Sequence, residues 1–229
     1  MLRTLEADSL IRAVIFDLDG TLCDSVEAHV RSWIEAVASF GHVLPRDLIL
    51  KLVGRTTREI AEELARLGLC PSVDELVRRK TEIFIGKYVD LVKPKPGVYD
   101  VLKELRELGL RLGIASSSKR EAVYRVLSRL ELWNFFNVVV TGEEVRRGKP
   151  EPDIFLEVCR RLSVKPLECV GVGDTVHDVI ACKRAGMMAI AIASEFYPRD
   201  LLAAHGADYV VSTLFEVATI IKSLIGASR

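Results

Sequence analysis

Apolar and polar residues follow two different patterns along this chain. Between residues 26 and 90, apolar residues recur every three or four positions, which is typical of helices that pack one face against a core. This part predicts helices at 26–40, 45–52, 57–67 and 71–90, and no strand. From residue 98 onward, helical patterns alternate with short apolar runs typical of buried strands. The predicted strands are 110–115, 138–140, 169–172, 188–193 and 209–211, and the helices between them include 98–108, 119–130, 152–162 and 176–185.

An apolar run at 13–16 precedes the helical part and predicts a central strand of the same parallel sheet. The helices then interrupt the alternation, and one crossover rarely contains four helices, so we interpret them as an insertion. The alternative is that they pack on the faces of the sheet. Prolines and a glycine at 92–97 predict a stiff connection back to the sheet. We therefore expect an α/β fold: a doubly wound, Rossmann-like core (residues 1–23 and 95–229) with an all-helical cap, the lid (residues 24–94).

The composition favours a globular protein and argues against a protein that binds nucleic acid or a membrane. The 229 residues are 49% hydrophobic, enough for a sizeable core. The 32 basic residues equal the 32 acidic ones, so net charge argues for neither nucleic acid nor a membrane surface as partner. No apolar stretch approaches the roughly 20 residues of a membrane span, and residues 1–10 lack a signal-peptide core. We expect a cytoplasmic protein.

The five cysteines are odd in number, scattered, and without metal-ligand spacing. They are Cys23, Cys70, Cys159, Cys169 and Cys182. We expect reduced, mostly packed thiols, although a thermophilic cytoplasm would reverse that expectation.

Chemically reactive residue types follow four of the predicted segments. They are Asp17 and Asp19 with Gly20 and Thr21, then Ser116, then Lys149 between Gly148 and Pro150, and finally Asp174 and Asp178. Each has an ordinary alternative: an Asp/Gly turn, a serine helix cap, a solvated lysine, or a surface charge. However, the carboxyl ends of parallel strands meet at one edge of a sheet, where sites form in such folds. The coincidence of all four favours a functional site.

In order, type and spacing, these segments resemble the four motifs of the haloacid dehalogenase superfamily of phosphatases and phosphomutases. The agreement covers residues 12–193, and the helical insert resembles the family's small helical cap. The resemblance implies a phosphatase that acts on a small phosphorylated metabolite through an aspartyl-phosphate, as a monomer or homodimer. It also implies Mg²⁺ as cofactor.

The chemistry assigns a role to each residue. Asp17 would be the nucleophile and Asp19 the general acid and base, while Lys149 would offset charge at Asp17. Asp174 and Asp178, one helical turn apart, would bind Mg²⁺ together with Asp17 and the backbone carbonyl of Asp19. Two carboxylates about 4 Å apart repel by roughly 4 kcal/mol at an effective dielectric of 20, so a cation is expected. The groups expected to hydrogen-bond the phosphoryl oxygens are Thr21, Ser116 and Ser117.

Substrate choice is expected to depend on the lid loop at 54–59. Arg55 or Arg58 would meet a carboxylate, hydroxyls or a second phosphate, with an ordinary helix-surface role as the alternative for Arg58 and Glu59. The lid is expected to move about its connections at 22–25 and 92–97.

Two features bear on the choice between phosphatase and mutase. Residues 24–33 resemble the opening of the cap in β-phosphoglucomutase relatives, and His29 there could contact Asp19 across the hinge, the alternative being a helix-face histidine. Thr21 is usual in the phosphatases, so we favour an enzyme resembling phosphoglycolate phosphatase and its sugar-phosphate relatives. A β-phosphoglucomutase-like mutase is the first alternative and a phospho-accepting receiver domain the second.

Overall fold

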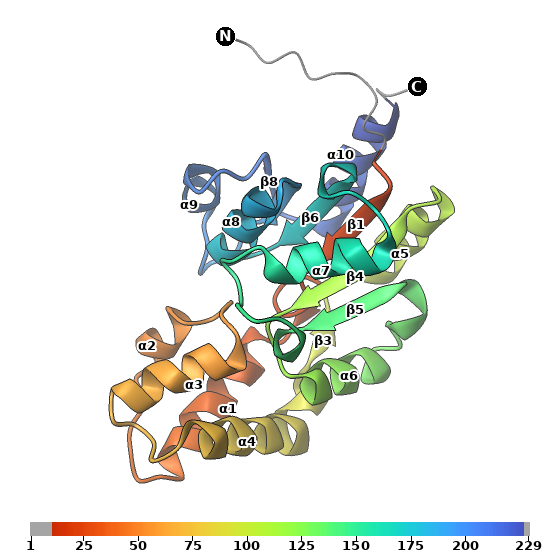
Figure 1. Cartoon of the computed structure of the whole chain (residues 1–229). Coiled ribbons are helices and arrows are strands. Elements are labelled where there is room, and N and C mark those ends of the chain that lie inside the picture. Colours follow the sequence, from red (N-terminus) through yellow and green to blue (C-terminus); the bar gives the residue numbers. More distant parts are fainter. Residues whose placement is uncertain (1–10, 227–229) are drawn as a thin grey trace.

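The computed structural model describes residues 11–226 and contains a six-stranded sheet in the order β5-β4-β1-β6-β7-β8 (Figure 1). All its neighbouring strands are parallel. The strands are β1 Ala13–Phe16, β4 Arg111–Ser116, β5 Val138–Thr141, β6 Cys169–Gly173, β7 Met188–Ile192 and β8 Tyr209–Val211. The predicted α/β fold class is confirmed.

Helices cover both faces of this sheet because its strands are apolar on both sides. Val14 and Phe16 of β1 belong to one apolar cluster, and Ala13 and Ile15 belong to another on the opposite face. The first cluster includes α5 Val98–Glu107, α6 Arg120–Arg129 and α10 Leu214–Gly226, and the second includes α7 Asp153–Leu162, α8 Val176–Ala185 and α9 Arg199–Ala204. Alternate side chains of a strand point to opposite faces, so a continuous apolar run is what two covered faces require.

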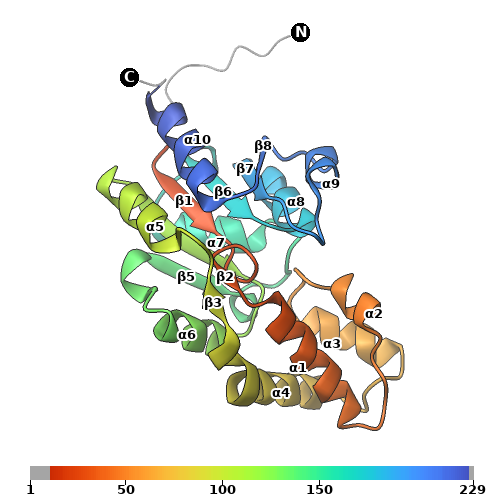
Figure 2. The same ribbon diagram turned by 180° about the vertical axis from the view of Figure 1, so that it is seen from behind.

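The helices between residues 24 and 94 stand beyond the carboxyl ends of the strands (Figures 1 and 2). They are α1 Val26–Ala38, α2 Arg46–Leu50, α3 Thr57–Arg66 and α4 Val73–Ile83. Their buried residues, Trp33, Ile60 and Leu76 among them, form a third apolar cluster of their own. A separate core is what a segment that does not pack on the sheet faces needs.

The predicted helix over 71–90 differs in the structure. Helix α4 ends at Ile83 and is followed by a π-helical turn, Phe84–Tyr88, and a 3₁₀ turn, Val89–Leu91. Phe84 is fully buried and its ring stacks on that of His29 with centroids 4.1 Å apart. The three kinds of helix differ in their number of residues per turn, but segments of five and three residues are too short for the apolar pattern to show the difference.

The two connections between sheet and lid pair with each other. The two-residue strands β2, Cys23–Asp24, and β3, Lys93–Pro94, are antiparallel (Figure 2). The sequence predicted only a stiff linker there, because two residues are too few to show a strand period. Further 3₁₀ turns lie at Trp133–Phe135, Gly142–Glu144 and Pro166–Glu168.

All five cysteines lie within residues 11–226, are buried, and carry no disulfide. The Sγ atoms of Cys159 and Cys169 lie 3.6 Å apart. The expected packing of these side chains in the interior is therefore seen.

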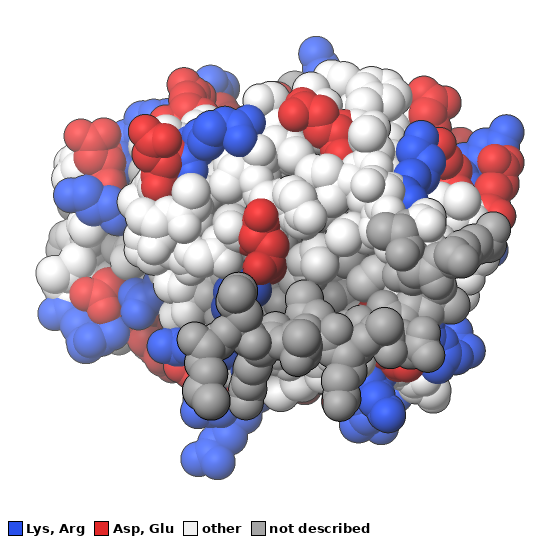
Figure 3. Space-filling view, turned by 90° about the horizontal axis from the view of Figure 1, so that it is seen from above, with Lys and Arg blue, Asp and Glu red and all other residues white. Residues whose placement is uncertain are grey.

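The surface charges are mixed in sign. On the face in Figure 3, Lys and Arg alternate with Asp and Glu around a largely uncharged centre. Surface ion pairs such as Lys183–Asp208 and Lys222–Glu104 bring opposite charges together. Where described residues are visible on this face, Lys and Arg are interspersed with Asp and Glu. Across residues 11–226, no helix has both the length and the apolar character that a membrane span requires.

Candidate active site

The turn after β1 brings the first motif against the fourth. The Asp17 N–H donates to the Val172 carbonyl of β6 at 2.8 Å, which holds Asp17 at the sheet edge. Gly20 has a φ of +93°, and a Cβ there would lie 2.4 Å from Asp174 Oδ2. Only glycine allows both this conformation and this close approach.

Three buried carboxylates meet at this edge. Oxygen atoms of Asp17, Asp174 and Asp178 lie within 4.8 Å of one another. Asp174 lies in the turn before α8, and Asp178 is the N3 residue of that helix. The sequence predicted that the two lie one helical turn apart on the same side of a helix, but Asp174 precedes α8 and is not part of it. Instead, the capping box turns Asp178 inward, since its Oδ2 accepts from Thr175 Oγ1 at 2.6 Å and from Thr175 N at 3.1 Å.

Burial and mutual repulsion disfavour the charged forms of these carboxylates. Burial raises the pKa of Asp17 well above its usual value, and the charges of Asp178 and Asp174 add to the effect, while Lys149 opposes it. Burial and the charge of Asp178 raise the pKa of Asp174 to about 7. Clustered carboxylate oxygens of this kind are the ligands of hard divalent cations, which relieve such repulsion. The residues present fit a divalent metal ion.

Lys149 places a positive charge beside the acidic cluster. Its Nζ lies 2.7 Å from Asp17 Oδ1 and 2.6 Å from Asp178 Oδ1, and donates to the Ala115 carbonyl at 2.7 Å. Burial alone would lower the pKa of this lysine, but the charges of Asp17 and Asp178 outweigh burial and raise the pKa. The ammonium therefore stays protonated beside the Asp17 carboxylate.

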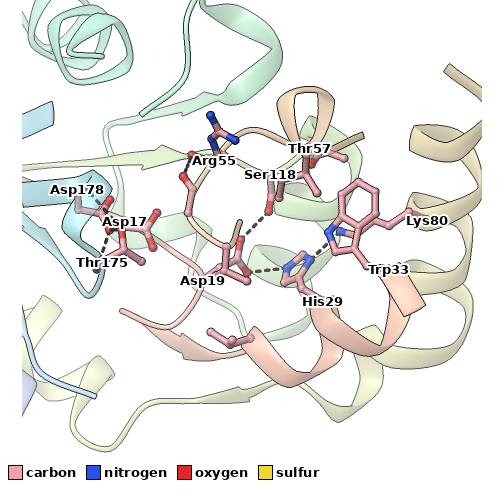
Figure 4. A pocket seen from close by; sticks show the side chains of 15 residues that line it. Asp17, Asp19, His29, Trp33, Arg55, Thr57, Lys80, Ser118, Thr175 and Asp178 are labelled. Atoms are coloured by element: carbon pink, nitrogen blue, oxygen red, sulfur yellow. Dashed lines mark hydrogen bonds and ion pairs between the residues drawn. The ribbon is translucent and has the colours of Figure 1, made fainter. Parts of the chain in front are cut away.

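Asp19 faces away from the three carboxylates. Its Oδ1 accepts from Ser25 Oγ at 2.6 Å and contacts His29 Nε2 at 3.0 Å, and its Oδ2 accepts from Ser118 Oγ at 2.7 Å. Burial would raise its pKa, but the attraction of the His29 ring and these hydrogen bonds hold the pKa of Asp19 well below its usual value. Figure 4 shows Asp19 between the Asp17 side of the pocket and the lid residues. Ser118 was not among the site residues predicted from the sequence.

The predicted contact between His29 and Asp19 continues to a lysine that sequence reasoning missed. Lys80 of α4 is 2% exposed, and its Nζ lies 2.7 Å from His29 Nδ1 (Figure 4). Because a lysine ammonium can only donate, Nδ1 accepts and the Nε2–H donates to Asp19. Burial lowers the pKa of His29, as does the charge of Lys80, and burial lowers the pKa of Lys80 itself to about 8. No sequence signal distinguished Lys80 from the other basic residues of a polar helix.

The hydroxyl groups of the motifs are already engaged. Thr21 Oγ1 donates to Asp174 Oδ1 at 2.9 Å, and Ser116 Oγ accepts the Ser118 N–H at 3.2 Å. Ser117 Oγ donates across to the Gly54 carbonyl of the lid at 2.8 Å. Thr21 thus orients an acidic residue, and Ser117 joins the core to the lid.

The lid contributes one wall of the pocket that contains Asp17 and Asp19. Arg55 belongs to this wall, as do the apolar residues Val26, Trp33, Val53 and Ile60. Arg58 lies outside this pocket, on the surface, where it pairs with Asp74 Oδ1 at 2.9 Å. A half-apolar wall opposite a charged floor suits a small, polar, partly carbon-based ligand.

Comparisons with known proteins agree with this geometry. The sequence profile described as haloacid dehalogenase-like hydrolase matches residues 14–192. The phosphorylated carbohydrates phosphatase of Thermotoga maritima is 34% identical over 182 residues, which are 79% of this chain and 84% of that protein. The β-phosphoglucomutase of Bacillus subtilis is 30% identical over 219 residues, which are 90% and 95% of the two chains. The crystal structure of CbbY from Rhodobacter sphaeroides in complex with phosphate has a TM-score of 0.81 and 26% identity, covering 90% of this chain and 96% of that one.

Proposed function

Because the chain belongs to the haloacid dehalogenase-like hydrolases, we propose that it is a Mg²⁺-dependent phosphatase that hydrolyses a small phosphate monoester through an aspartyl-phosphate. Family membership makes the chain a phosphatase or a phosphomutase. Hydrolysis through an aspartyl-phosphate and dependence on Mg²⁺ are what we propose in addition. The observation that carries it is the different setting of the two motif aspartates. Asp17 lies beside Lys149 and the acidic cluster, whereas Asp19 has hydrogen bonds of its own to Ser25, His29 and Ser118.

In the first step, an Asp17 oxygen attacks the phosphorus atom and the bond to the leaving oxygen breaks. Lys149, charged and within 2.7 Å of Asp17, offsets the repulsion between the carboxylate and the phosphoryl oxygens. Asp19 gives its proton to the leaving oxygen. The low pKa of Asp19 without substrate must therefore rise on binding, which the approach of an anionic phosphoryl group causes.

In the second step, Asp19 takes a proton from a water molecule that attacks the phosphorus of the aspartyl-phosphate. The bond to the Asp17 oxygen breaks, which releases phosphate and restores the carboxylate. The Nε2–H of His29 would hold the Asp19 side chain toward the leaving group in both steps.

The metal would be held by Asp17, Asp174, Asp178 and the backbone carbonyl of Asp19. When bound, Mg²⁺ would supply positive charge to the phosphoryl oxygens and to the acidic cluster. The raised pKa values of Asp17 and Asp174 support a cation at this point, since burial and mutual repulsion disfavour the charged carboxylates.

We also propose that residues 24–94 act as a moving lid, with β2 and β3 as its hinge. Arg55 would meet the part of the substrate that remains after phosphate leaves, while Arg58 would have to release Asp74 to do so. Phosphoglycolate and sugar phosphates are the substrates we favour, and the relative named for phosphorylated carbohydrates supports the latter.

The test is phosphate release, with Mg²⁺, from phosphoglycolate, β-glucose 1-phosphate, other sugar phosphates, pyrophosphate and a nucleotide. We expect one small ester to lead the series. No release from any compound, with no isomerised product either, would contradict the proposal.

A β-phosphoglucomutase-like reaction is the second candidate. The pair His29–Lys80 favours this reaction, because the Lys80 ammonium acts on Asp19 through His29. Proton transfer by Asp19 would then depend on lid closure, and a closed lid would restrain attack by water. Glucose 6-phosphate formed from β-glucose 1-phosphate with little free phosphate would establish this alternative. The receiver-domain hypothesis is set aside, since the hydrolase family covers residues 14–192.

A further inference from the structure

The first turn of helix α3 in the lid rests directly on the loop that carries Lys149. Glu59, the N3 residue of α3, accepts through Oε2 from Thr56 N at 2.9 Å and from Thr56 Oγ1 at 2.8 Å. Its other oxygen, Oε1, accepts from the Gly148 N–H of the core at 3.3 Å. One carboxylate therefore completes a helix cap in the lid and also binds the backbone next to Lys149.

A core glycine makes room for this contact. A Cβ on Gly148 would lie 2.3 Å from Thr56 Cγ2 and 2.6 Å from Glu59 Oε2. Gly148 does not have a left-handed backbone, so its φ does not itself require glycine. The absence of a side chain there serves the close approach of the lid.

Neighbouring contacts hold the same surfaces together. The Thr57 N–H of the lid donates to the Ser117 carbonyl at 3.3 Å, and Thr56 and Thr57 are both buried. The contact thus lies between two loops of the core, one with Ser117 and the other with Lys149. A swing of the lid about β2 and β3 would separate all these groups at once.

We propose that Glu59 is a positioning residue for Lys149: on lid closure its carboxylate binds the Gly148 N–H and holds the Lys149 backbone where the ammonium reaches Asp17. This inference rests on the proposed phosphatase reaction and on a mobile lid. Lys149 is then correctly placed beside Asp17 only when the lid is closed. With the lid open, the site catalyses phosphoryl transfer to water poorly.

The first test compares Glu59→Ala with Glu75→Ala. Glu75 is the N3 residue of α4, where Ser72 caps its N–H, and its carboxylate contacts Arg78 and Arg79 of the same helix. We expect Glu59→Ala to lower kcat by about 10- to 100-fold with a smaller change in KM, because Lys149 is misplaced in the transition state. Glu59→Gln, whose amide oxygen can accept the Gly148 N–H only with its NH2 group turned toward the Thr56 N–H, should recover part of the loss. Glu75→Ala should match the wild type in kcat.

The second test does not depend on turnover. With Mg²⁺ and orthovanadate present to favour closure, amide exchange at Gly148, measured by NMR, should be about tenfold faster in Glu59→Ala than in the wild type or Glu75→Ala. Gly148→Ala should prevent vanadate from reducing the radius of gyration in X-ray scattering. Gly86→Ala is the matched control, since a Cβ on Gly86 would meet nothing within 4 Å.

The outcomes separate the two proposals. Equal kcat and equal Gly148 exchange in Glu59→Ala and Glu75→Ala would overturn the positioning role and leave Glu59 as a helix cap. Gly148→Ala that closes as readily as Gly86→Ala would overturn the close-approach argument. A wild type without phosphatase activity, but with Gly148 protection that depends on Glu59, would reject the proposed reaction and keep the closure contact.

Discussion

At the scale of single residues, the site depends on charges that the interior does not tolerate unpaired. Asp17 is 7% exposed and its charge is balanced by the ammonium of Lys149. Asn has the same shape as Asp and removes a charge that burial disfavours. A neutral side chain at this position should therefore be tolerated by the fold but not by the reaction.

Asp17→Asn should reduce phosphate release by at least about 10⁴-fold, because an amide oxygen does not replace the carboxylate nucleophile. Its melting temperature by circular dichroism should stay within a few °C of the wild type. Near-wild-type turnover in this variant would remove Asp17 from the nucleophile role.

Lys149→Met should destabilise the protein by about 3–5 kcal/mol in EDTA, since it leaves Asp17 and Asp178 buried without their cation. The matched control is Lys103→Met. The Lys103 ammonium is exposed and 3.9 Å from Glu107, so its loss should change the free energy of unfolding by less than about 0.5 kcal/mol. Urea unfolding measures both. Equal losses in the two variants would mean that the Lys149 ion pairs are not important to stability.

At the scale of elements, the N-cap residue of α8, Thr175, also orients a member of the acidic cluster, Asp178. Thr175 accepts the Asp178 N–H and donates to Asp178 Oδ2, so the helix cap also sets the direction of an acidic side chain. The start of α8 and the acidic cluster therefore depend on each other.

Thr175→Ala should cost about 1–2 kcal/mol of stability and also weaken Mn²⁺ binding, measured by electron paramagnetic resonance, because Asp178 loses the bond that orients it. Ser72→Ala removes the N-cap of α4 far from the cluster and should leave Mn²⁺ affinity unchanged. Unchanged affinity in Thr175→Ala would show that Lys149 alone suffices to orient Asp178.

At the scale of the whole molecule, stability should depend jointly on pH and metal. The pKa of Asp174 is raised from 3.8 to about 7, so the folded protein holds a proton that the unfolded chain has released. This contribution to stability is complete below the unfolded pKa and is lost as the pH rises through about 7. A divalent cation replaces the proton, so its effect grows over the same range.

Melting temperatures in EDTA should accordingly fall from about pH 5 to about pH 8, whereas added Mg²⁺ should raise them by a few °C at the higher pH and little at the lower. Asp174→Asn should reduce both the fall of the melting temperature with pH in EDTA and the increase of the Mg²⁺ effect with pH. EDTA should also abolish turnover, and Mg²⁺ should restore it. Full activity in chelator, or a Mg²⁺ effect independent of pH, would contradict the metal site.

The core fold and the main site residues could be predicted because their signals are local. A strand covered on both faces must be apolar at every position, and reactive residues after such strands must meet at one edge of the sheet. That reasoning predicted Asp17, Asp19 and Asp174 at this edge, whereas Lys149 and Asp178 were predicted from the order and spacing of the motifs that the sequence shares with the family. The sequence left open whether His29 contacts Asp19 or is an ordinary helix-face histidine, and the structure shows the contact at 3.0 Å.

Only the tertiary structure showed which individual polar groups of distant segments contact one another. Lys80 is 51 residues from His29, and the Glu59 carboxylate reaches the Gly148 N–H across 89 residues. Neither contact has a local pattern, since a buried lysine and a surface lysine look alike in a polar helix. The hydrophobic period determined which elements form, because burial acts on each segment by itself. Only the packing of the lid against the sheet determined how polar groups of the two parts meet, because hydrogen bonds and ion pairs require distances that sequence spacing does not contain.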